Sequence, residues 1–298
     1  MSKPGYRPYS VRVAALEQVS PSFTRVRFTS DDLADVTRHG PDQRVKVVLP
    51  LPGTGLSSFP AGDDWYARWR RQGDRERNPI RTYTLRHCDP AARELVVDFV
   101  AHGDTGPATR WVSRAAVGDE VLVLAPDATS TDAAGGYAWQ PGRASTLLVA
   151  GDETAVPAIV SILESLPDDA SGVAFLEVPS TLDVQPVVAP AGVAVRWLPR
   201  EGEETASHGV ALDREVRRWA ARHLGCSRVA VGAAAGSDAD PEVLWEVPDA
   251  EVRDGLYAWI AGEAGAVTGL RRHLVRDLGV EASRVAFMGY WKAGRAEN

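Results

Sequence analysis

Cysteine is scarce in this chain of 298 residues, which contains only Cys88 and Cys226. Two cysteines so far apart in sequence argue against a disulfide framework and against a cysteine-rich metal site. Long hydrophobic runs are also missing, because no apolar stretch approaches the roughly 18 residues of a membrane span. The N-terminal MSKPGYRPYSV lacks the apolar segment of a secretory signal. We therefore expect a cytoplasmic protein with no membrane partner and no resident metal.

An excess of basic charge is missing as well. The chain has 33 Lys and Arg residues against 40 Asp and Glu residues, which gives a net charge of -7. This balance argues against a broad surface for nucleic acid or anionic membranes, although a local basic pocket stays open. The 44% hydrophobic and 24% charged residues are typical of a soluble globular protein. A chain of this length predicts two domains, and we expect a monomer.

The hydrophobic periodicity changes near residue 143, and this change predicts a domain boundary. Before it, six short segments alternate apolar with polar residues and are separated by turn residues, as strands are. They lie at residues 9–19, 23–30, 44–50, 81–88, 94–102 and 119–126. Six such strands with one helical interruption predict a small antiparallel barrel, which leaves no free edge. We expect this barrel domain to span residues 1–142.

The second half of the chain alternates apolar strands with amphipathic helices, after a linker at residues 131–144. This pattern predicts a mostly parallel sheet that is covered by helices on both faces. The expected strands lie at residues 146–151, 172–178, 193–198, 256–262 and 284–291, and the expected helices at 157–166, 211–224 and 265–279. We expect an α/β nucleotide-binding domain at residues 143–298.

Two glycine-containing loops, AGDETAVPA and AGEAGAV, follow strands of this half and lead into helices. Gly151 in the first loop permits a tight turn, and the Asp-Glu-Thr after it can cap the helix. Free N–H groups at such helix starts favour phosphate, so a dinucleotide would fit there. Capped turns without a ligand are the alternative. Neither loop contains the full G-x-G-x-x-G fingerprint or a Walker lysine, which excludes a standard Rossmann or P-loop assignment.

A second group of polar residues lies in the barrel half. In RTYTLRHC, Arg81 and Tyr83 share one face of a predicted strand, and Thr84 follows them. Further on, His102 leads into a glycine-rich turn, and Gly106–Thr109 opens a short helix. An arginine beside that helix start could hold a pyrophosphate, and a tyrosine offers a flat face to a ring. An ordinary barrel aromatic and a surface histidine are the alternative interpretations.

Taken in order, these segments resemble the siderophore-interacting protein family, flavoreductases related to ferredoxin-NADP reductases. The resemblance covers nearly the whole chain and rests on VKVVLP, WYARWR, RTYTLR, VDFVAHGDTGPATRW, GDETAVPAI, WIAGEAGAV and GYWKAGRAE. It implies FAD in the barrel, NADPH or NADH as electron donor on the α/β domain, and a ferric siderophore as electron acceptor.

The resemblance also implies roles for single residues. By the family's R-x-Y-T motif, Arg81 would face the FAD phosphate, and Tyr83 and Thr84 would face its ring system. The other residues that it assigns to cofactors are Asp98, Val100, His102, Gly106, Pro107, Ala108 and Thr109 for FAD, and Gly151, Asp152, Glu153, Thr154, Gly262 and Glu263 for the nicotinamide nucleotide.

The expected substrate site departs from the family's pattern. Lys46 matches a basic position of the family, whereas Asp127 and Thr268 stand where the family commonly has arginine. Lys292 and Arg295 could restore positive charge. We therefore expect weak binding of highly anionic ferric catecholates and a preference for neutral or weakly charged chelates such as hydroxamates. Tyr290 and Trp291 could border the flavin edge or close the core of the last strand.

No catalytic side chain is required, because the cofactors carry the chemistry of such a reaction. The expected function is an NAD(P)H-dependent ferric-siderophore reductase. A flavoreductase with another acceptor, such as free flavin, a quinone or a partner protein, is one alternative. A chelate-binding protein without turnover is another. The sequence does not choose between NADPH and NADH, and Arg200 is a candidate contact for a 2'-phosphate.

Overall fold

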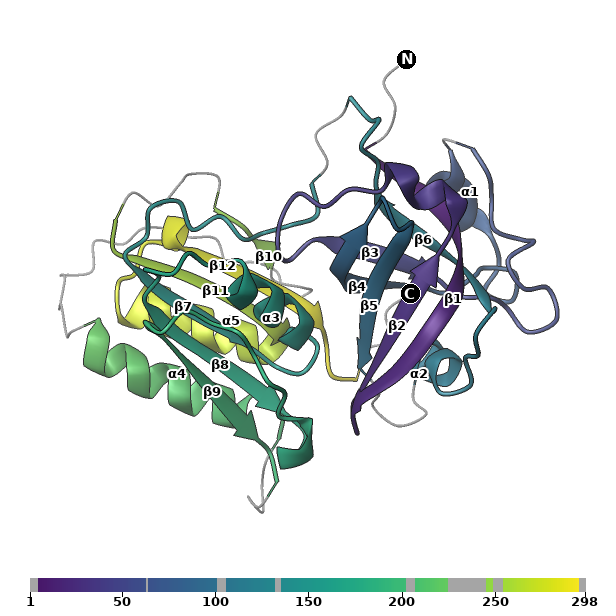
Figure 1. Ribbon diagram of the computed structural model, residues 1–298. Helices are drawn as coiled ribbons and strands as arrows, with labels where there is room; N and C mark the ends of the chain where they lie inside the picture. Colours follow the sequence, from purple (N-terminus) through teal and green to yellow (C-terminus); the bar gives the residue numbers. More distant parts are fainter. Residues whose placement is uncertain are drawn as a thin grey trace. The chain divides into compact units, whose positions relative to one another are not determined.

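The chain forms two compact units, one from the described residues up to Tyr137 and one from Ala138 onward (Figure 1). The computed structural model describes residues 5–62, 64–100, 106–131, 135–201, 207–224, 245–248 and 254–294. Each unit has its own hydrophobic core and its own sheet.

The first unit is a closed antiparallel barrel, as predicted from the alternating segments. Its strands are β1 (Tyr6–Ser20), β2 (Phe23–Thr29), β3 (Arg44–Val48), β4 (Ile80–Asp89), β5 (Glu94–Val100) and β6 (Glu120–Pro126). They pair in the order β1-β2-β5-β4-β3-β6, and β6 closes the barrel on β1. Because every strand has two partners, the barrel exposes no free edge.

The alternation that predicted these strands is visible in their burial. In β3, Val45 and Val47 are fully buried, whereas Lys46 between them is exposed. Aromatic side chains complete the core, with Phe28 and Phe99 tilted against each other and Trp111 beside both. Each large side chain that is fully buried contributes about 1.5–3 kcal/mol to folding.

Short helices interrupt the barrel at three places. They are the 3-10 helix η1 (Asp31–Asp35) and the α-helices α1 (Trp65–Arg71) and α2 (Pro107–Val112). Helix α1 forms from the charged run before β4, because Trp69 is buried and its indole N–H donates to the carbonyl of Asn78 at 2.8 Å. Helix α2 leads from β5 towards β6 and buries Ala108 and Val112 in the barrel core.

The second unit contains a six-stranded sheet in the order β10-β12-β11-β7-β8-β9. Its strands are β7 (Thr146–Gly151), β8 (Gly172–Val178), β9 (Val193–Pro199), β10 (Trp245–Glu246), β11 (Leu256–Glu263) and β12 (Val285–Trp291). All neighbours are parallel except β10, which runs antiparallel to β12 at the edge. The predicted mostly parallel sheet is therefore confirmed.

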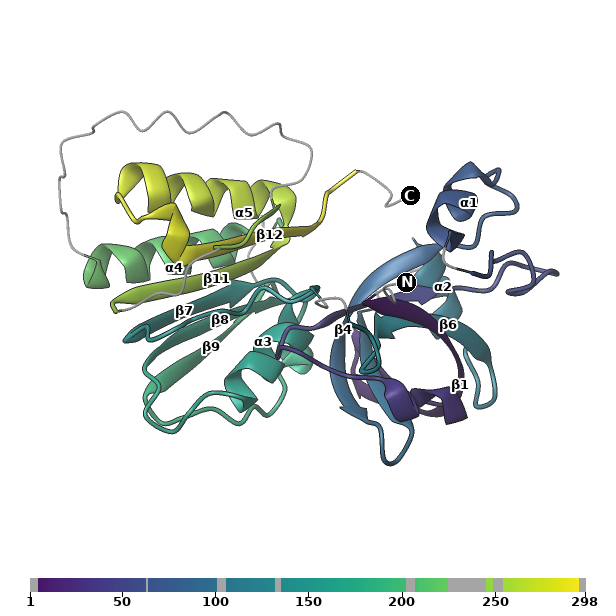
Figure 2. The same cartoon turned by 90° about the horizontal axis from the view of Figure 1, so that it is seen from above.

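Helices cover both faces of this sheet (Figure 2). Helix α3 (Val156–Glu164) lies on one face, and helices α4 (Val210–His223) and α5 (Ala264–Arg271) lie on the other. The π-helix η3 (Arg272–Asp277) continues α5, and the 3-10 helices η2 (Thr181–Asp183) and η4 (Ala282–Arg284) lie in connections. Strand β11 is buried along its length because it lies in the middle of the sheet.

Candidate functional sites

Strand β4 presents its polar residues on two different faces. Arg81 and Tyr83 lie opposite Val47 and Val45 of β3, whereas Thr84 lies opposite Arg44. Residues that face each other across an antiparallel pair share one side of the sheet, and neighbours along a strand alternate. Arg81 and Tyr83 therefore share a face, as predicted, and the side chain of Thr84 lies on the other face of β4.

Arg81 is a half-buried cation without an acidic partner among the described residues. Its Nη1 donates to the carbonyl of Ile80 at 2.9 Å. Other arginines of the barrel pair with carboxylates, such as Arg12 with Glu120. The Arg81 guanidinium therefore keeps donors available for an anionic group.

Tyr83 and Thr84 are held in place by the barrel. The ring centroid of Tyr83 lies 4.4 Å from that of Phe99, and the half-buried Tyr83 packs against the core. Thr84 is 5% exposed. The ring of Tyr83 is thus held against the barrel core, and the position of Thr84 is fixed by burial.

The neighbouring strand β5 carries Asp98 and Val100, the next residues predicted to adjoin a cofactor. The buried carboxylate of Asp98 accepts from Arg25 through Nε at 2.7 Å and Nη2 at 2.9 Å. Arg86 lies 3.9 Å from the same carboxylate. Asp98 therefore cross-links β2, β5 and β4. Val100 ends β5, is half-buried and faces Phe23 of β2.

The turn after β5 is only partly described. His102 lies outside the described residues, whereas Gly106, Pro107, Ala108 and Thr109 form the start of α2. Gly106 is the extended N-cap residue, and no side chain caps the helix there. A Cβ placed on Gly106 would meet nothing within 4 Å, so close packing does not explain this glycine.

The two predicted loops of the second unit come together at one point of the sheet. Strand β7 has β8 on one side and β11 on the other, so the order of strands reverses between β7 and β11. In open α/β sheets, ligands bind outside the carboxyl ends of the strands at such a switch point. Gly151–Thr154 follows β7, and Gly262 and Glu263 end β11. The predicted residues therefore lie where the topology places a ligand.

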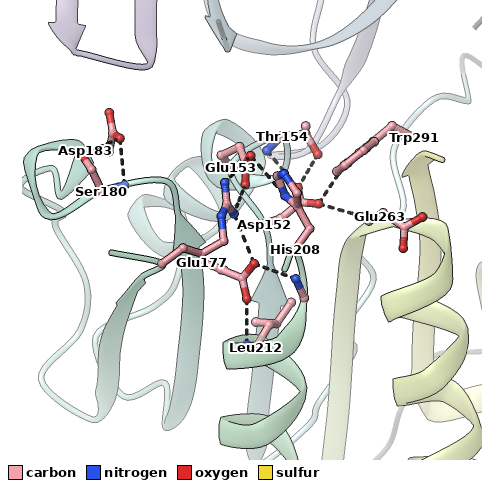
Figure 3. Close-up of polar contacts among 12 residues, drawn as sticks. Asp152, Glu153, Thr154, Glu177, Ser180, Asp183, His208, Leu212, Glu263 and Trp291 are labelled. Carbon is pink, nitrogen blue, oxygen red and sulfur yellow. Dashed lines mark hydrogen bonds and ion pairs between the residues drawn. The ribbon is translucent and has the colours of Figure 1, made fainter. Parts of the chain in front are cut away.

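Asp152 joins the ends of three strands (Figure 3). Its Oδ1 accepts from the backbone N–H of Thr154 at 2.9 Å and from the Thr154 hydroxyl at 2.5 Å. Its Oδ2 accepts from the backbone N–H of Glu263 and from Trp291 Nε1, both at 2.8 Å. Burial and the nearby charge of Glu153 raise the pKa of Asp152 to about 6, although these hydrogen bonds oppose the shift.

Glu153 lies in a second buried network, which the sequence analysis did not predict. Arg200 donates to both of its carboxylate oxygens, at 2.7 and 2.8 Å, and also to Glu177 at 3.2 Å. Glu177 accepts from the backbone N–H groups of Gly209 and Leu212 at 2.7 and 2.9 Å. The candidate for a 2'-phosphate contact, Arg200, is therefore paired with two carboxylates inside the protein.

Two further side chains adjoin these networks. His208 Nδ1 lies 3.5 Å from Glu153, and its ring meets Trp291 edge to face with centroids 5.0 Å apart. Trp291 thus contacts polar groups at the strand ends instead of closing the core of the last strand, and its expected place at the flavin edge stays a prediction. Sequence reasoning missed Glu177 and His208, although a lone acid in the apolar run GVAFLEV was a signal for Glu177.

Gly262 and Glu263 shape the end of β11. Gly262 has φ +146°, and a Cβ there would come within 2.6 Å of the Asp152 carboxylate. Glycine therefore lets β11 pass close to the Asp152 side chain. Glu263 caps α5, because its Oε2 accepts from the Ala266 N–H at 2.9 Å.

The residues expected to bind the substrate are separated in the chain. Lys46 is exposed on the same face of the barrel as Thr82, to whose hydroxyl its Nζ donates at 3.3 Å. Lys292 follows β12 and is half-buried. Arg295 lies outside the described residues.

The two departures from the family pattern have local partners. Asp127 is buried and lies 3.1 Å from Arg7 Nε, and it accepts from the N–H and hydroxyl of Thr129, both at 2.8 Å. Thr268 is exposed on α5, and its hydroxyl donates to the carbonyl of Ala264 at 2.7 Å. The charge of Asp127 is therefore largely balanced within the barrel unit.

No helix among the described residues is long and apolar enough to cross a membrane. The same residues contain no group of three or more His, Cys, Asp or Glu side chains arranged to hold a metal ion.

Both units match models of one protein family. Residues 12–130 match the siderophore-interacting FAD-binding domain, and residues 144–294 match the siderophore-interacting protein model. The siderophore-interacting protein SipS from Aeromonas hydrophila is 31% identical, with a TM-score of 0.69 over 98% of this chain and 94% of that chain. The ferric vibriobactin reductase ViuB of Vibrio cholerae is 27% identical over 284 residues, which is 94% of this chain and 87% of that protein.

More distant structures share the fold alone. A ferredoxin NADP+ reductase from Neisseria gonorrhoeae, solved with bound FAD and NADP, is 12% identical with a TM-score of 0.56. The alignment covers 97% of this chain and 100% of that chain. The barrel followed by a parallel α/β sheet is therefore the arrangement of the ferredoxin reductases. Because family models match most of its length, the chain belongs to the siderophore-interacting protein family.

Proposed function

We propose that this protein uses FAD to pass electrons from a nicotinamide nucleotide to the iron of a ferric siderophore. The match to a siderophore-interacting FAD-binding domain supports the flavin. The relatives named ferric vibriobactin reductase and ferric acinetobactin reductase support the acceptor, the second over 34% of this chain.

The environment of Arg81 is the structural observation that best supports FAD binding. A half-buried guanidinium without a carboxylate partner among the described residues is well suited to a pyrophosphate, because charge-assisted hydrogen bonds to phosphate are strong. Tyr83 lies on the same face of β4 and would present its ring to the flavin side. Thr84 lies on the opposite face, so its main chain is the part of this residue that we assign to the cofactor.

The reaction requires the protein to bind and orient the cofactors rather than to perform acid–base chemistry. When bound, FAD supplies the conversion of one hydride, which carries two electrons, into single electrons for two ferric ions. Ferrous iron binds hard oxygen ligands more weakly than ferric iron does, so reduction would release the metal from its chelator. The barrel's part is to hold the phosphate through Arg81 and to fix a ring face through Tyr83.

We assign the nicotinamide nucleotide to the switch point of the second unit. The carboxylates of Asp152 and Glu153 are buried and paired, so the loop would contact the nucleotide mainly through its main chain. Gly262 and Glu263 would border the same place from β11. In this division the side chains of Asp152 and Glu153 hold the loop in place, and the nucleotide meets the main chain of the loop.

For the chelate we propose a contact with Lys46, supported by Lys292 and Arg295. Asp127 is paired with Arg7, so its negative charge is a weaker obstacle to an anionic chelate than its sequence position suggests. The preference for neutral or weakly charged chelates then rests on the arginines that are absent at positions 127 and 268. Replacement of Lys46 by alanine should raise the apparent KM for the chelate and leave flavin reduction unchanged.

A three-part experiment tests the proposed function. The purified protein should be yellow, NADH or NADPH should bleach it without oxygen, and added ferric chelates should yield ferrous iron in a colorimetric trap. Bleaching without ferrous iron from any of a panel of hydroxamates, catecholates and citrate would indicate another acceptor. A protein that binds chelates but neither FAD nor nucleotide would be a carrier, contrary to the proposal.

A further inference from the structure

The carboxyl ends of β8 and β9 contain one cation that is already bound within the protein. Arg200, directly after β9, donates two hydrogen bonds to Glu153 and one to Glu177. Its side chain is 10% exposed, and both carboxylates are fully buried. Figure 3 shows Glu153 and Glu177 on neighbouring strand ends, turned towards one another.

Arg200 is held there by more than its own contacts. Glu177 also accepts two backbone N–H groups at the start of α4, and Glu153 also lies beside His208. If the guanidinium turned outward to a ligand, two buried carboxylates would lose their counter-charge, which is strongly unfavourable. Glu153 and Glu177 therefore compete with any ligand phosphate for Arg200.

The surroundings of Arg200 add negative rather than positive charge. Glu201 is exposed and accepts from the N–H and hydroxyl of Thr181 at 3.2 and 3.0 Å. In the adjoining turn, Asp183 accepts from Ser180. His208 is a further side chain that could carry positive charge, and its Nδ1 lies 3.5 Å from Glu153.

These strand ends matter for the choice of nucleotide. The parallel strands run in the order β9-β8-β7-β11-β12, which matches the order 3-2-1-4-5 of dinucleotide-binding sheets. In those sheets the adenosine ribose lies near the end of the second strand, where an acid suits a free 2'-hydroxyl and an arginine suits a 2'-phosphate. Here the second strand is β8, which ends beside Arg200, because the Arg200 N–H donates to the Val178 carbonyl.

We propose that this protein selects NADH over NADPH because Glu153 and Glu177 hold Arg200 away from the 2' position. The inference rests on the proposed function, since it concerns the same nucleotide site. A 2'-phosphate would meet a paired arginine and excess acid, whereas a ribose diol would meet hydrogen-bond acceptors.

The test compares anaerobic flavin reduction by NADH and NADPH over a range of concentrations in the FAD-loaded protein. We expect the rate constant for flavin reduction at limiting nucleotide to be about tenfold or more higher for NADH, because the 2'-phosphate of NADPH would meet acidic groups. Equal rates, or faster reduction by NADPH, would overturn the inference and leave the proposed function intact. If neither nucleotide bleaches a flavin that dithionite does bleach, the proposed function fails, and the inference fails with it.

A pair of charge-reversal variants tests whether the charge at the end of β9 sets the preference for NADH. Glu201→Arg places a new cation at the end of β9, and it should raise the efficiency of NADPH several-fold with little change for NADH. Asp169→Arg makes the same change of charge on an exposed residue in the turn that precedes β8. This turn lies at the opposite end of β8 from Arg200. An equal gain for NADPH in both variants would show that overall charge, rather than this position, sets the preference.

Discussion

Arg81 is the residue whose replacement separates flavin binding from folding. Arg81→Ala removes a charge-assisted contact worth roughly 1.5–3 kcal/mol, so FAD affinity should fall by about 10- to 150-fold. The fold should survive, because no described carboxylate loses a partner. Titration of the apoprotein with FAD measures the effect. Arg12→Ala, at an exposed pair with Glu120, is the matched control, and equal retention of FAD by both variants would contradict the assignment.

The raised pKa of Asp152 predicts that the stability of the folded protein depends on pH. Its pKa is about 6 in the folded protein and ordinarily 3.8, so the folded state holds this proton more tightly. The contribution of Asp152 is therefore fully present below about pH 4 and is lost as the pH rises to about 6. Besides burial, the charge of Glu153 in the same loop raises this pKa, and Glu153 in turn contacts Arg200 and His208.

Comparison with Asp152→Asn isolates this contribution from the other titrating groups. The side-chain NH₂ group of the new asparagine would face N–H donors whose hydrogen bonds the Asp152 carboxylate accepts, so the variant should be less stable at every pH. Its deficit relative to the natural protein should shrink between about pH 4 and pH 6, as measured by urea unfolding. A deficit that stayed constant or grew over this range would show that Asp152 does not titrate as inferred.

At the scale of the element, Gly151 belongs to the packing of α3 against the sheet. A Cβ there would come within 2.5 Å of the Ala155 Cβ and 2.7 Å of the Ala261 carbonyl oxygen. Gly151→Ala should therefore destabilise the protein by about 1–3 kcal/mol, as overpacking does. Gly269→Ala in α5 is the control, since its nearest neighbour would be 4.0 Å away and alanine favours a helix. Similar unfolding midpoints for both variants would contradict this account.

This packing role also shows where sequence reasoning reached its limit. Strand periodicity predicted both sheets, because alternation and continuous apolar runs are local properties of the sequence. The positions of the two βα loops followed from the same pattern. The orientation of Asp152 and Glu153 did not, because their partners are Trp291, Glu263 and Arg200, which lie far away in sequence. A capping motif looks the same whether its acids face a ligand or the core.

At the scale of the whole molecule, net charge predicts how salt acts on the substrate. The net charge of -7 repels a triply anionic ferric tris-catecholate, and salt screens this repulsion over a Debye length of about 10 Å at 0.1 M. The apparent KM for such a chelate should therefore fall as NaCl is raised from about 20 to 200 mM. A neutral hydroxamate serves as the control and should show no change. A KM that rises with salt would indicate that a basic site dominates instead.

The start of α4 depends on a residue that lies well outside the helix. Its N-cap is Gly209 at φ +82°, which offers no capping side chain, and the N–H groups of Gly209 and Leu212 donate to Glu177. Glu177 precedes these two residues by 32 and 35 positions. An isolated helix of 14 residues is marginal in water, so α4 gains a complete first turn only when β8 is in place. We therefore expect the first turn of α4 to lose its protection from amide hydrogen exchange whenever the end of β8 opens.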